Sequence, residues 1–206
     1  FTSDMSLEDA QKLAENLGLH HSVIPIGDIY DSFNKGLEKE FKGKEKDITE
    51  ENLQSRCRGV ILMALSNKSG DLVLTTGNKS ETAVGYSTLY GDTAGGFGVL
   101  KDVPKTMVYE LSRYRNTISK VIPERIIERP PTAELAPDQK DTDSLPDYDI
   151  LDKIIELYVE QDKSKEEIVS LGVGNDVIEK VLKLIDISEY KRRQAPLGVK
   201  ITSRGF

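Results

Sequence analysis

Apolar residues recur at helical spacing near the start of the chain. A capping box, Ser6-Leu7-Glu8-Asp9, predicts a helix that Gly18 ends. The apolar side of this helix carries Ala10, Leu13, Ala14 and Leu17. His20–Ile26 (HHSVIPI) then alternates between polar and apolar residues, which predicts a strand. The same reasoning predicts helices over 29–40, 50–65 and 81–90 and a further strand over 72–75.

The order of these elements predicts the fold class. A glycine-rich loop, 91–98 (GDTAGGFG), is followed by a helix over 104–114 that has proline in its first turn. Helices and strands in this order are typical of an α/β fold, a doubly wound parallel sheet.

The character of the chain changes after Val121. Prolines and aspartates are frequent between Pro123 and Asp149, as in a solvated linker. Helices are predicted beyond it, over 150–160, from Ser164 and over 176–185, and residues 195–206 are predicted to be a tail or a lid. We therefore divide the chain into a nucleotide-binding α/β core, 1–130, and a C-terminal region, 131–206, with a linker, helices and a basic tail.

Composition excludes several classes of function. Of the 206 residues 37% are hydrophobic, and the net charge of −7 argues against a nucleic-acid partner. No apolar run approaches the roughly 18 residues of a membrane span. The single cysteine, Cys57, and the absence of a signal-peptide pattern at the start indicate a cytoplasmic protein. His20 and His21 have no metal ligands at suitable spacing, so no zinc site is expected.

The segment from Asp71 to Asp92 carries the candidate chemistry. It leads from the predicted strand through Thr76-Gly77-Asn78-Lys79-Ser80-Glu81 into a helix. Open α/β sheets bind ligands at such a turn. The turn holds a hydroxyl, an amide, an ammonium and a carboxylate, groups that bind phosphates and their metal ions. The sequence therefore predicts a nucleotide site here.

Several segments, in this order, resemble the NAD synthetases. They are ENLQSR (51–56), TGNKSE (76–81), YGD (90–92), PPTAEL (130–135), APDQKDTDSL (136–145) and YKRRQAPLGVKITSRGF (190–206). The last two resemble the glutamine-dependent form in particular, and the similarity covers essentially the whole chain.

The resemblance implies an ATP-pyrophosphatase version of the doubly wound sheet and a ligase activity. In this family ATP adenylates the nicotinate carboxylate of deamido-NAD, pyrophosphate leaves, and ammonia displaces AMP to give NAD. It implies ATP and Mg²⁺, deamido-NAD as substrate, and a nitrilase-like glutaminase domain that supplies ammonia. A homo-oligomer is expected as well.

The resemblance also assigns roles to residues. It implies that Thr76, Lys105 and Thr132 contact ATP, and that Glu81 binds Mg²⁺ or deamido-NAD. The residues implied for deamido-NAD are Asn52, Arg56, Lys191 and Arg192. No acid–base residue is obligatory, because adenylation depends mainly on positioning and on charge stabilisation.

Each of these residues also has a purely structural interpretation. Asn52 and Arg56 are one turn apart on a helix and fit a solvated face. Lys105 fits an ordinary first-turn lysine and Thr132 an N-cap for a helix near Ala133. Glu81 suits a helix N-terminus with or without a metal ion. Lys191-Arg192-Arg193 fits a surface patch.

Three other functions stay open. The chain could be a non-catalytic nucleotide-binding or dimerisation module with the same fold, a different ATP-pyrophosphatase, or an ammonia-only NAD synthetase. The segments 76–81 and 190–206 argue against a different ATP-pyrophosphatase, and 138–145 argues against the ammonia-only form.

The family's pyrophosphate loop, Ser-Gly-Gly-x-Asp-Ser, does not occur in this sequence. Backbone N–H groups of such a loop hold the leaving pyrophosphate. We therefore expect these 206 residues alone to have little synthetase activity. We also expect them to self-associate through an uncovered apolar surface.

Overall fold

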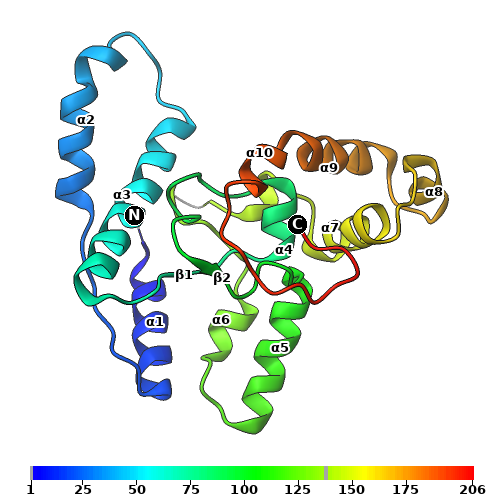
Figure 1. The fold of residues 1–206 in the computed structure, drawn as a ribbon, viewed down its shortest axis with the longest axis horizontal. Coiled ribbons are helices and arrows are strands. Elements are labelled where there is room, and N and C mark those ends of the chain that lie inside the picture. Colours follow the sequence, from blue (N-terminus) through cyan, green and yellow to red (C-terminus); the bar gives the residue numbers. More distant parts are fainter. Residues whose placement is uncertain (1, 137–138) are drawn as a thin grey trace.

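The computed structural model describes residues 2–136 and 139–206. Phe1 and residues 137–138, which belong to the APDQKDTDSL segment and to the proline- and aspartate-rich stretch, lie outside the described residues. The fold has a small central sheet with helices around it, and the first three helices lie together on one side of the molecule (Figure 1).

The predicted first helix is confirmed, but its start is corrected. The helix, α1, spans Asp4–Leu17, and its N-cap is Ser3 rather than Ser6. The Ser3 hydroxyl accepts a hydrogen bond from the Ser6 amide at 3.2 Å. The Ser6 hydroxyl instead donates to Glu134 Oε1 at 2.6 Å, a partner that is far away in the sequence.

The strand predicted over His20–Ile26 is wrong. The described residues 19–26 form neither helix nor strand, and the side chains of Val23 and Ile24 are 59% and 46% exposed. Alternation alone does not make a strand, because an extended segment is stable only when a neighbouring strand satisfies its N–H and C=O groups. Within the described part of the chain no strand pairs with this segment.

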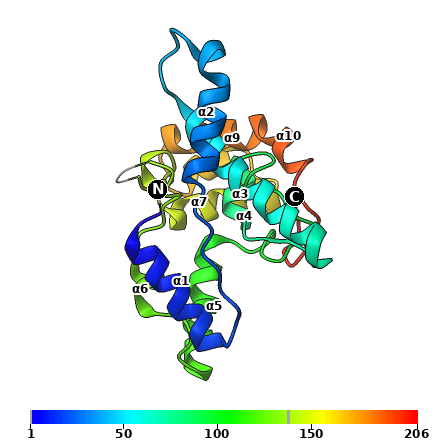
Figure 2. The same ribbon diagram turned by 90° about the vertical axis from the view of Figure 1, so that its left-hand side faces the viewer.

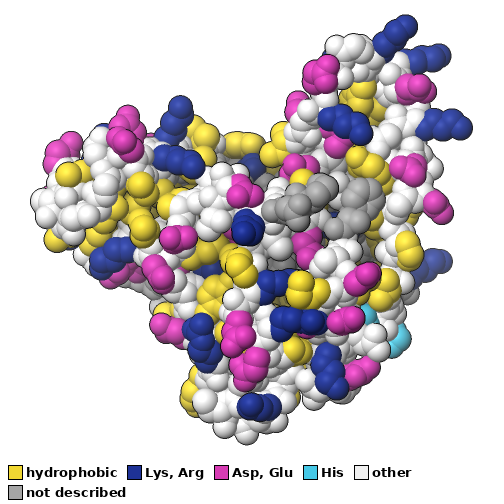
Figure 3. Space-filling view, turned by 180° about the vertical axis from the view of Figure 1, so that it is seen from behind, with side chains coloured by type: hydrophobic (Ala, Val, Ile, Leu, Met, Phe, Trp, Pro, Cys, Tyr) yellow, Lys and Arg dark blue, Asp and Glu magenta, His cyan; other side chains and the backbone are white. Residues whose placement is uncertain are grey.

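Two further helices belong to this side of the molecule. Helix α2 spans Gly27–Phe41 and packs against α3, Ile48–Ser69. Asp47 and Glu50 form a capping box at the start of α3, and Gly70 in the left-handed conformation ends it. Helix α2 projects away from the rest of the molecule in a second view (Figure 2), and charged side chains lie along this projection in the space-filling view (Figure 3).

The central sheet is parallel, as predicted for an α/β fold. Strand β1, Leu74–Thr75, pairs with β2, Phe97–Gly98, and α4, Lys79–Val84, lies between them in the sequence. Strand β2 was not predicted, because its residues fall in the glycine-rich stretch. Helix α4 ends sooner than the predicted residue 90, since Gly85 has a φ of 66° and forms its C-cap.

The elements after β2 surround this sheet. Helix α5 spans Lys105–Ile118 and confirms the predicted helix, while the short α6, Glu124–Glu128, and the 3-10 turn η1, Asp141–Asp143, lie in the stretch predicted as linker. The predicted C-terminal helices are α7, Tyr148–Ile155, continued by the π-helical turn η2, Glu156–Glu160, then α8, Lys165–Ser170, and α9, Asn175–Ile187. Helix α10 spans Glu189–Arg192.

An apolar core lies between α4 and the C-terminal helices. Ala83 and Val84 of α4 pack with side chains of α7, α8 and α9, among them Leu151, Ile168 and Ile178, each of which is fully buried. This core holds α4 in place, and α4 carries the turn predicted to bind nucleotide. None of the described helices combines the length and the apolarity that a membrane span requires.

Candidate functional site

A cavity of about 460 Å³ opens beside the carboxyl end of β1. Its walls come from the turn after β1, from α4 and α5, from residues 126–135 and from the segment 191–196. Ligands of open α/β sheets bind at this end of the strands. The volume suits a small-molecule ligand.

The turn predicted to bind nucleotide is fixed by its own side chains. Asn78 Oδ1 accepts a hydrogen bond from the Glu81 amide at 3.0 Å, and Glu81 Oε2 accepts one from the Asn78 amide at 3.2 Å. This reciprocal pair is a capping box. Thr76 and Gly77 just before it face the cavity, together with Glu81.

Lys105 lies at the start of α5 and points into the cavity. Its Nζ donates to Glu81 Oε1 at 2.9 Å, with the two side chains 17% and 19% exposed. The rings of Tyr148 and Tyr109 lie 5.3 and 6.0 Å from the ammonium. Burial disfavours the charged lysine, but the attraction and the hydrogen bond of Glu81 outweigh it and raise the pKa of Lys105. Lys105 is therefore held as a cation.

Two side chains from other elements cap α5 and so hold Lys105 in place. Ser80 Oγ accepts a hydrogen bond from the Lys105 amide at 2.8 Å and itself donates to Asp152. Asp152 Oδ2 accepts from both the amide and the hydroxyl of Thr106, at 2.9 and 2.8 Å. Pro104 before the helix has no side-chain oxygen for this purpose.

Lys191 and Arg192 line the cavity next to the C-terminal end of α4. Lys191 Nζ donates to the carbonyls of Gly85 and Ser87, and Arg192 donates to that of Ala83 at 2.7 Å. Cations stabilise a helix C-terminus, where carbonyls lack partners. Burial lowers the pKa of both side chains. They are therefore part of the cavity wall and not a surface patch, whereas Arg193 pairs with Glu189 on the surface.

Asp141 and Tyr86 line another side of the cavity, and Tyr148 forms a hydrogen bond with Asp141. Tyr148 donates to Asp141 Oδ2 at 2.7 Å, and Asp141 Oδ1 is buried without a hydrogen-bond partner among the described residues. Burial, followed by the negative charge of Asp141, raises the pKa of Tyr86, and burial with the hydrogen bond to Asp141 raises the pKa of Tyr148. Both tyrosines therefore stay neutral hydrogen-bonding groups.

The described walls of the cavity carry more positive than negative groups. The cations are Arg58, Lys101, Lys105, Arg129, Lys191 and Arg192, and the carboxylates are Glu81, Asp92 and Asp141. Burial raises the pKa of Asp92, because desolvation disfavours its charged form. An excess of cations in a partly enclosed cavity favours an anionic ligand.

The structure brings together most of the residues that the sequence implied. Those that line the cavity are Thr76, Glu81, Lys105, Thr132, Lys191 and Arg192. Asn52 and Arg56 of α3 do not line it: Asn52 Oδ1 accepts from the Thr88 hydroxyl at 2.7 Å, and Arg56 donates to the Leu89 carbonyl at 3.2 Å. Both therefore support the loop behind the cavity wall.

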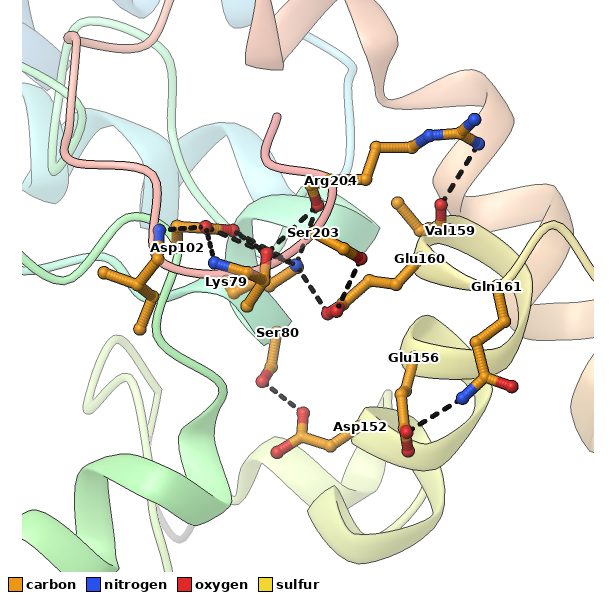
Figure 4. A network of polar contacts seen from close by, with 12 residues as sticks. Lys79, Ser80, Asp102, Asp152, Glu156, Val159, Glu160, Gln161, Ser203 and Arg204 are labelled. Atoms are coloured by element: carbon orange, nitrogen blue, oxygen red, sulfur yellow. Dashed lines mark hydrogen bonds and ion pairs between the residues drawn. The ribbon is translucent and has the colours of Figure 1, made fainter.

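One expectation within the turn is corrected. The Lys79 ammonium does not face the cavity; the side chain is 1% exposed and is paired with Asp102 and Glu160 on the other side of the turn (Figure 4). Sequence reasoning also missed Arg58 and Lys101 as cavity cations. Arg58 lies two residues after Arg56, and Lys101 follows the glycine-rich stretch. No pattern in the sequence distinguishes these two cations from ordinary surface residues.

The described residues contain no cluster of three or more His, Cys, Asp or Glu side chains that could hold a metal ion unaided. Mg²⁺ commonly binds through one or two carboxylates together with substrate phosphates. Glu81 fits that mode, since it is a carboxylate at the cavity. Its two oxygens already accept hydrogen bonds from Lys105 and from the Asn78 amide.

Comparison with known proteins identifies the relatives of this fold. Residues 1–195 match the sequence profile of NAD synthase. The chain belongs to the NAD synthase family. A glutamine-dependent NAD(+) synthetase of Acinetobacter baylyi is 56% identical over 208 aligned residues, which cover all of this chain and 38% of that protein.

Solved structures of NAD synthase relatives have a similar fold. A glutamine-dependent NAD+ synthetase from Acinetobacter baumannii, in complex with ADP, is 49% identical with a TM-score of 0.63, and covers all of this chain and 37% of that one. An NMN synthetase from Francisella tularensis is 25% identical with a TM-score of 0.77, covering 92% of this chain and 71% of that one. The α/β fold of the ATP-pyrophosphatase type is thereby confirmed. The chain spans less than two-fifths of the length of these glutamine-dependent relatives.

Proposed function

We propose that this chain contributes the nucleotide-binding part of a glutamine-dependent NAD synthetase. The observation that carries the proposal is the cationic cavity at the carboxyl end of β1, where six of the implied site residues meet: Thr76, Glu81, Lys105, Thr132, Lys191 and Arg192. ATP and deamido-NAD are both polyanions, and clustered cations neutralise such ligands. The family match supports the same assignment.

In the proposed reaction the nicotinate carboxylate of deamido-NAD attacks the α-phosphorus of ATP, and the bond to pyrophosphate breaks. Ammonia then attacks the adenylated carboxyl carbon, AMP leaves with one carboxylate oxygen, and a proton is released. Thr76, Lys105 and Thr132 would hold ATP. Lys105 would neutralise charge that develops on the phosphates, because Glu81 keeps it protonated.

The remaining roles are those that the family resemblance implies. Lys191 and Arg192, which line the cavity at the end of α4, would bind deamido-NAD, and Glu81 would hold Mg²⁺, which when bound supplies further charge neutralisation. Asn52 and Arg56 stay proposed for deamido-NAD. Since they do not line this cavity, their contact would lie on the outer side of the loop at 88–89.

The partners of the whole protein are also proposals. We propose that ammonia comes from a nitrilase-like glutaminase domain, that the protein is a cytoplasmic homo-oligomer, and that its ligands are small molecules. The relatives named glutamine-dependent NAD(+) synthetase support the source of the ammonia.

Isothermal titration calorimetry of the chain with ATP and Mg²⁺, and separately with deamido-NAD, tests the proposal. We expect both to bind and Lys105→Met to weaken ATP binding about tenfold or more, which corresponds to roughly 1.4 kcal/mol. The matched control is Lys120→Met, because the side chain of Lys120 is 82% exposed. Failure of the wild-type chain to bind either ligand would refute the proposal.

A further inference from the structure

The ammonium of Lys79 is buried among oxygen atoms that come from three distant parts of the chain. Its Nζ lies 2.7 Å from Glu160 Oε1 and 3.1 Å from Asp102 Oδ1. It also donates to Thr202 Oγ1 at 2.6 Å and to the Arg204 carbonyl at 2.9 Å. A charge out of contact with water is stable only when it is paired and hydrogen-bonded in this way. Figure 4 shows these groups converging.

Asp102 links this buried lysine to the backbone of the C-terminal segment, residues 195–206. Asp102 Oδ2 accepts the amides of Ile201 and Thr202 at 2.7 and 2.8 Å. Burial by itself raises the pKa of the Asp102 carboxyl, but these amides, Lys79 and the Thr202 hydroxyl outweigh it and hold the pKa below its usual range. Lys79 and Asp102 therefore form a charged anchor for the segment.

The other end of the same segment forms a wall of the cavity. Ala195 and Pro196 line it, and Lys101, also a lining residue, donates to the Pro196 carbonyl at 2.8 Å. The Gly98 amide at the end of β2 donates to the Leu197 carbonyl at 2.8 Å. A Cβ added to Gly198 would lie 2.5 Å from the Gly98 carbonyl oxygen, so the segment is in close contact with the sheet.

We propose that Lys79 is a positioning residue that holds residues 195–206 against the sheet and thereby fixes the Ala195–Pro196 wall of the cavity. Lys79 itself lies in the turn that carries Thr76 and Glu81. Its side chain therefore links this turn to the segment that carries Ala195 and Pro196, and both line the cavity. The consequence for nucleotide affinity rests on the proposed function. The consequence for the segment itself does not.

Hydrogen exchange with residue-level resolution on the 206-residue chain tests the anchor. Lys79→Met leaves Asp102 and Glu160 buried without a cation, so a loss of global stability is expected as well. Two further variants separate the effects. Lys79→Met/Glu160→Gln also removes the charge of Glu160, one of the two carboxylates that Lys79→Met leaves without a cation. Thr202→Val removes only a hydroxyl. Lys200→Met, on an exposed residue of the same segment, is the matched control.

In Lys79→Met/Glu160→Gln we expect the amides of Gly98, Ala195, Ile201 and Thr202 to exchange at least tenfold faster, while those in the middle of α9 keep their wild-type rates. Thr202→Val should accelerate the same amides by a smaller factor, and Lys200→Met should not. ATP with Mg²⁺ should bind the double variant at least tenfold more weakly than wild type, although its thermal midpoint recovers part of the loss seen in Lys79→Met.

Two results would overturn the inference. Faster exchange at Ile201 and Thr202 with unchanged exchange at Gly98 and Ala195 would mean that the anchor acts only locally. Unchanged ATP affinity, despite faster exchange at all four amides, would mean that the cavity wall does not depend on it. If the wild-type chain bound no ATP, the proposed function would fail, and exchange at Gly98 and Ala195 would still decide the positioning role.

Discussion

Glu81→Gln separates the charge of this side chain from its role as a helix cap. Glu81 Oε2 accepts the Asn78 amide at 3.2 Å, and the carbonyl of a glutamine can accept the same hydrogen bond. Glu81 Oε1 accepts from Lys105 Nζ at 2.9 Å. The variant therefore keeps the cap, removes one negative charge from the cavity, and leaves Lys105 without its hydrogen-bonded carboxylate partner.

The size of the stability loss follows from the burial of the pair. Breaking a fully buried ion pair costs about 3–5 kcal/mol, and an exposed pair contributes about 0–1 kcal/mol. The side chains of Lys105 and Glu81 are 17% and 19% exposed, and the ring of Tyr148 still lies 5.3 Å from the ammonium. We expect Glu81→Gln to lower the free energy of unfolding by about 1–3 kcal/mol. Glu81→Ala, which also loses the cap, should cost about 1 kcal/mol more.

The pH dependence of this loss has a defined sign. The pKa of Lys105 is raised in the folded chain, because Glu81 outweighs the opposing effect of burial. A raised lysine pKa contributes stability that is complete below the unfolded value of about 10.4 and is lost as the pH rises through the folded value. The difference between wild type and Glu81→Gln should therefore stay constant from pH 7 to about pH 10 and shrink above it.

Urea unfolding followed by circular dichroism, from pH 7 to 11, measures both quantities, and calorimetry with ATP measures the effect on the ligand. If Glu81 holds Mg²⁺, the variant should bind ATP with Mg²⁺ about tenfold more weakly, and ATP with a chelator no more weakly than wild type. Glu124→Gln, in an exposed pair with Lys120, is the matched control. A variant as stable as wild type would refute the ion-pair reasoning, and equal losses of ATP affinity with and without Mg²⁺ would refute the metal role.

Two further substitutions test the surroundings of the cavity. Burial and the hydrogen bond to Asp141 raise the pKa of Tyr148, so the stability that Tyr148 contributes should be lost as the pH rises above the unfolded pKa of about 10. Tyr148→Phe should therefore lower the free energy of unfolding by about 1–3 kcal/mol at pH 7 and reduce its fall at alkaline pH in urea titrations. A fall as steep as that of wild type would contradict this. Gly85→Ala should lower the free energy of unfolding by about 2 kcal/mol or more in the same assay, because φ is 66° and the added Cβ would lie 2.2 Å from Ser188 Oγ. Gly172→Ala, also at positive φ but with no atom within 4 Å of the added Cβ, should lower it by less.

Local signals in the sequence predicted much of the helical structure. Helices α1, α3 and α9 follow from apolar residues at helical spacing, and Gly18 ends α1 as expected. The strand predictions failed at two segments, because the formation of a strand depends on a neighbouring strand. His20–Ile26 has the alternation of a strand, but no strand of the described residues pairs with it, whereas the glycine-rich Phe97–Gly98 is a strand because β1 lies alongside.

The candidate site shows the same division. Thr76 and Glu81 could be predicted, because a strand, a turn and a capping residue are consecutive in the sequence. The direction of the Lys79 side chain could not, since its partners Asp102, Glu160 and Thr202 are brought to it only by tertiary packing. Lysine at that position fits a phosphate contact and a buried ion pair equally well until those partners are known.

Under the proposed function, the placement of Lys105 favours binding of the anion through a side chain and not through the first amides of α5. A lysine in the first turn of a helix is electrostatically unfavourable, because the N-terminus already carries positive partial charge. The amides of Lys105 and Thr106, which could have bound an anion there, already donate to Ser80 and Asp152. What α5 presents to the cavity is therefore the Lys105 ammonium, kept protonated by Glu81. Under the proposed function, a phosphate that displaced Glu81 from Lys105 would find a cation already in place and would release the carboxylate for Mg²⁺. The Lys105–Glu81 pair would then couple the two ligands.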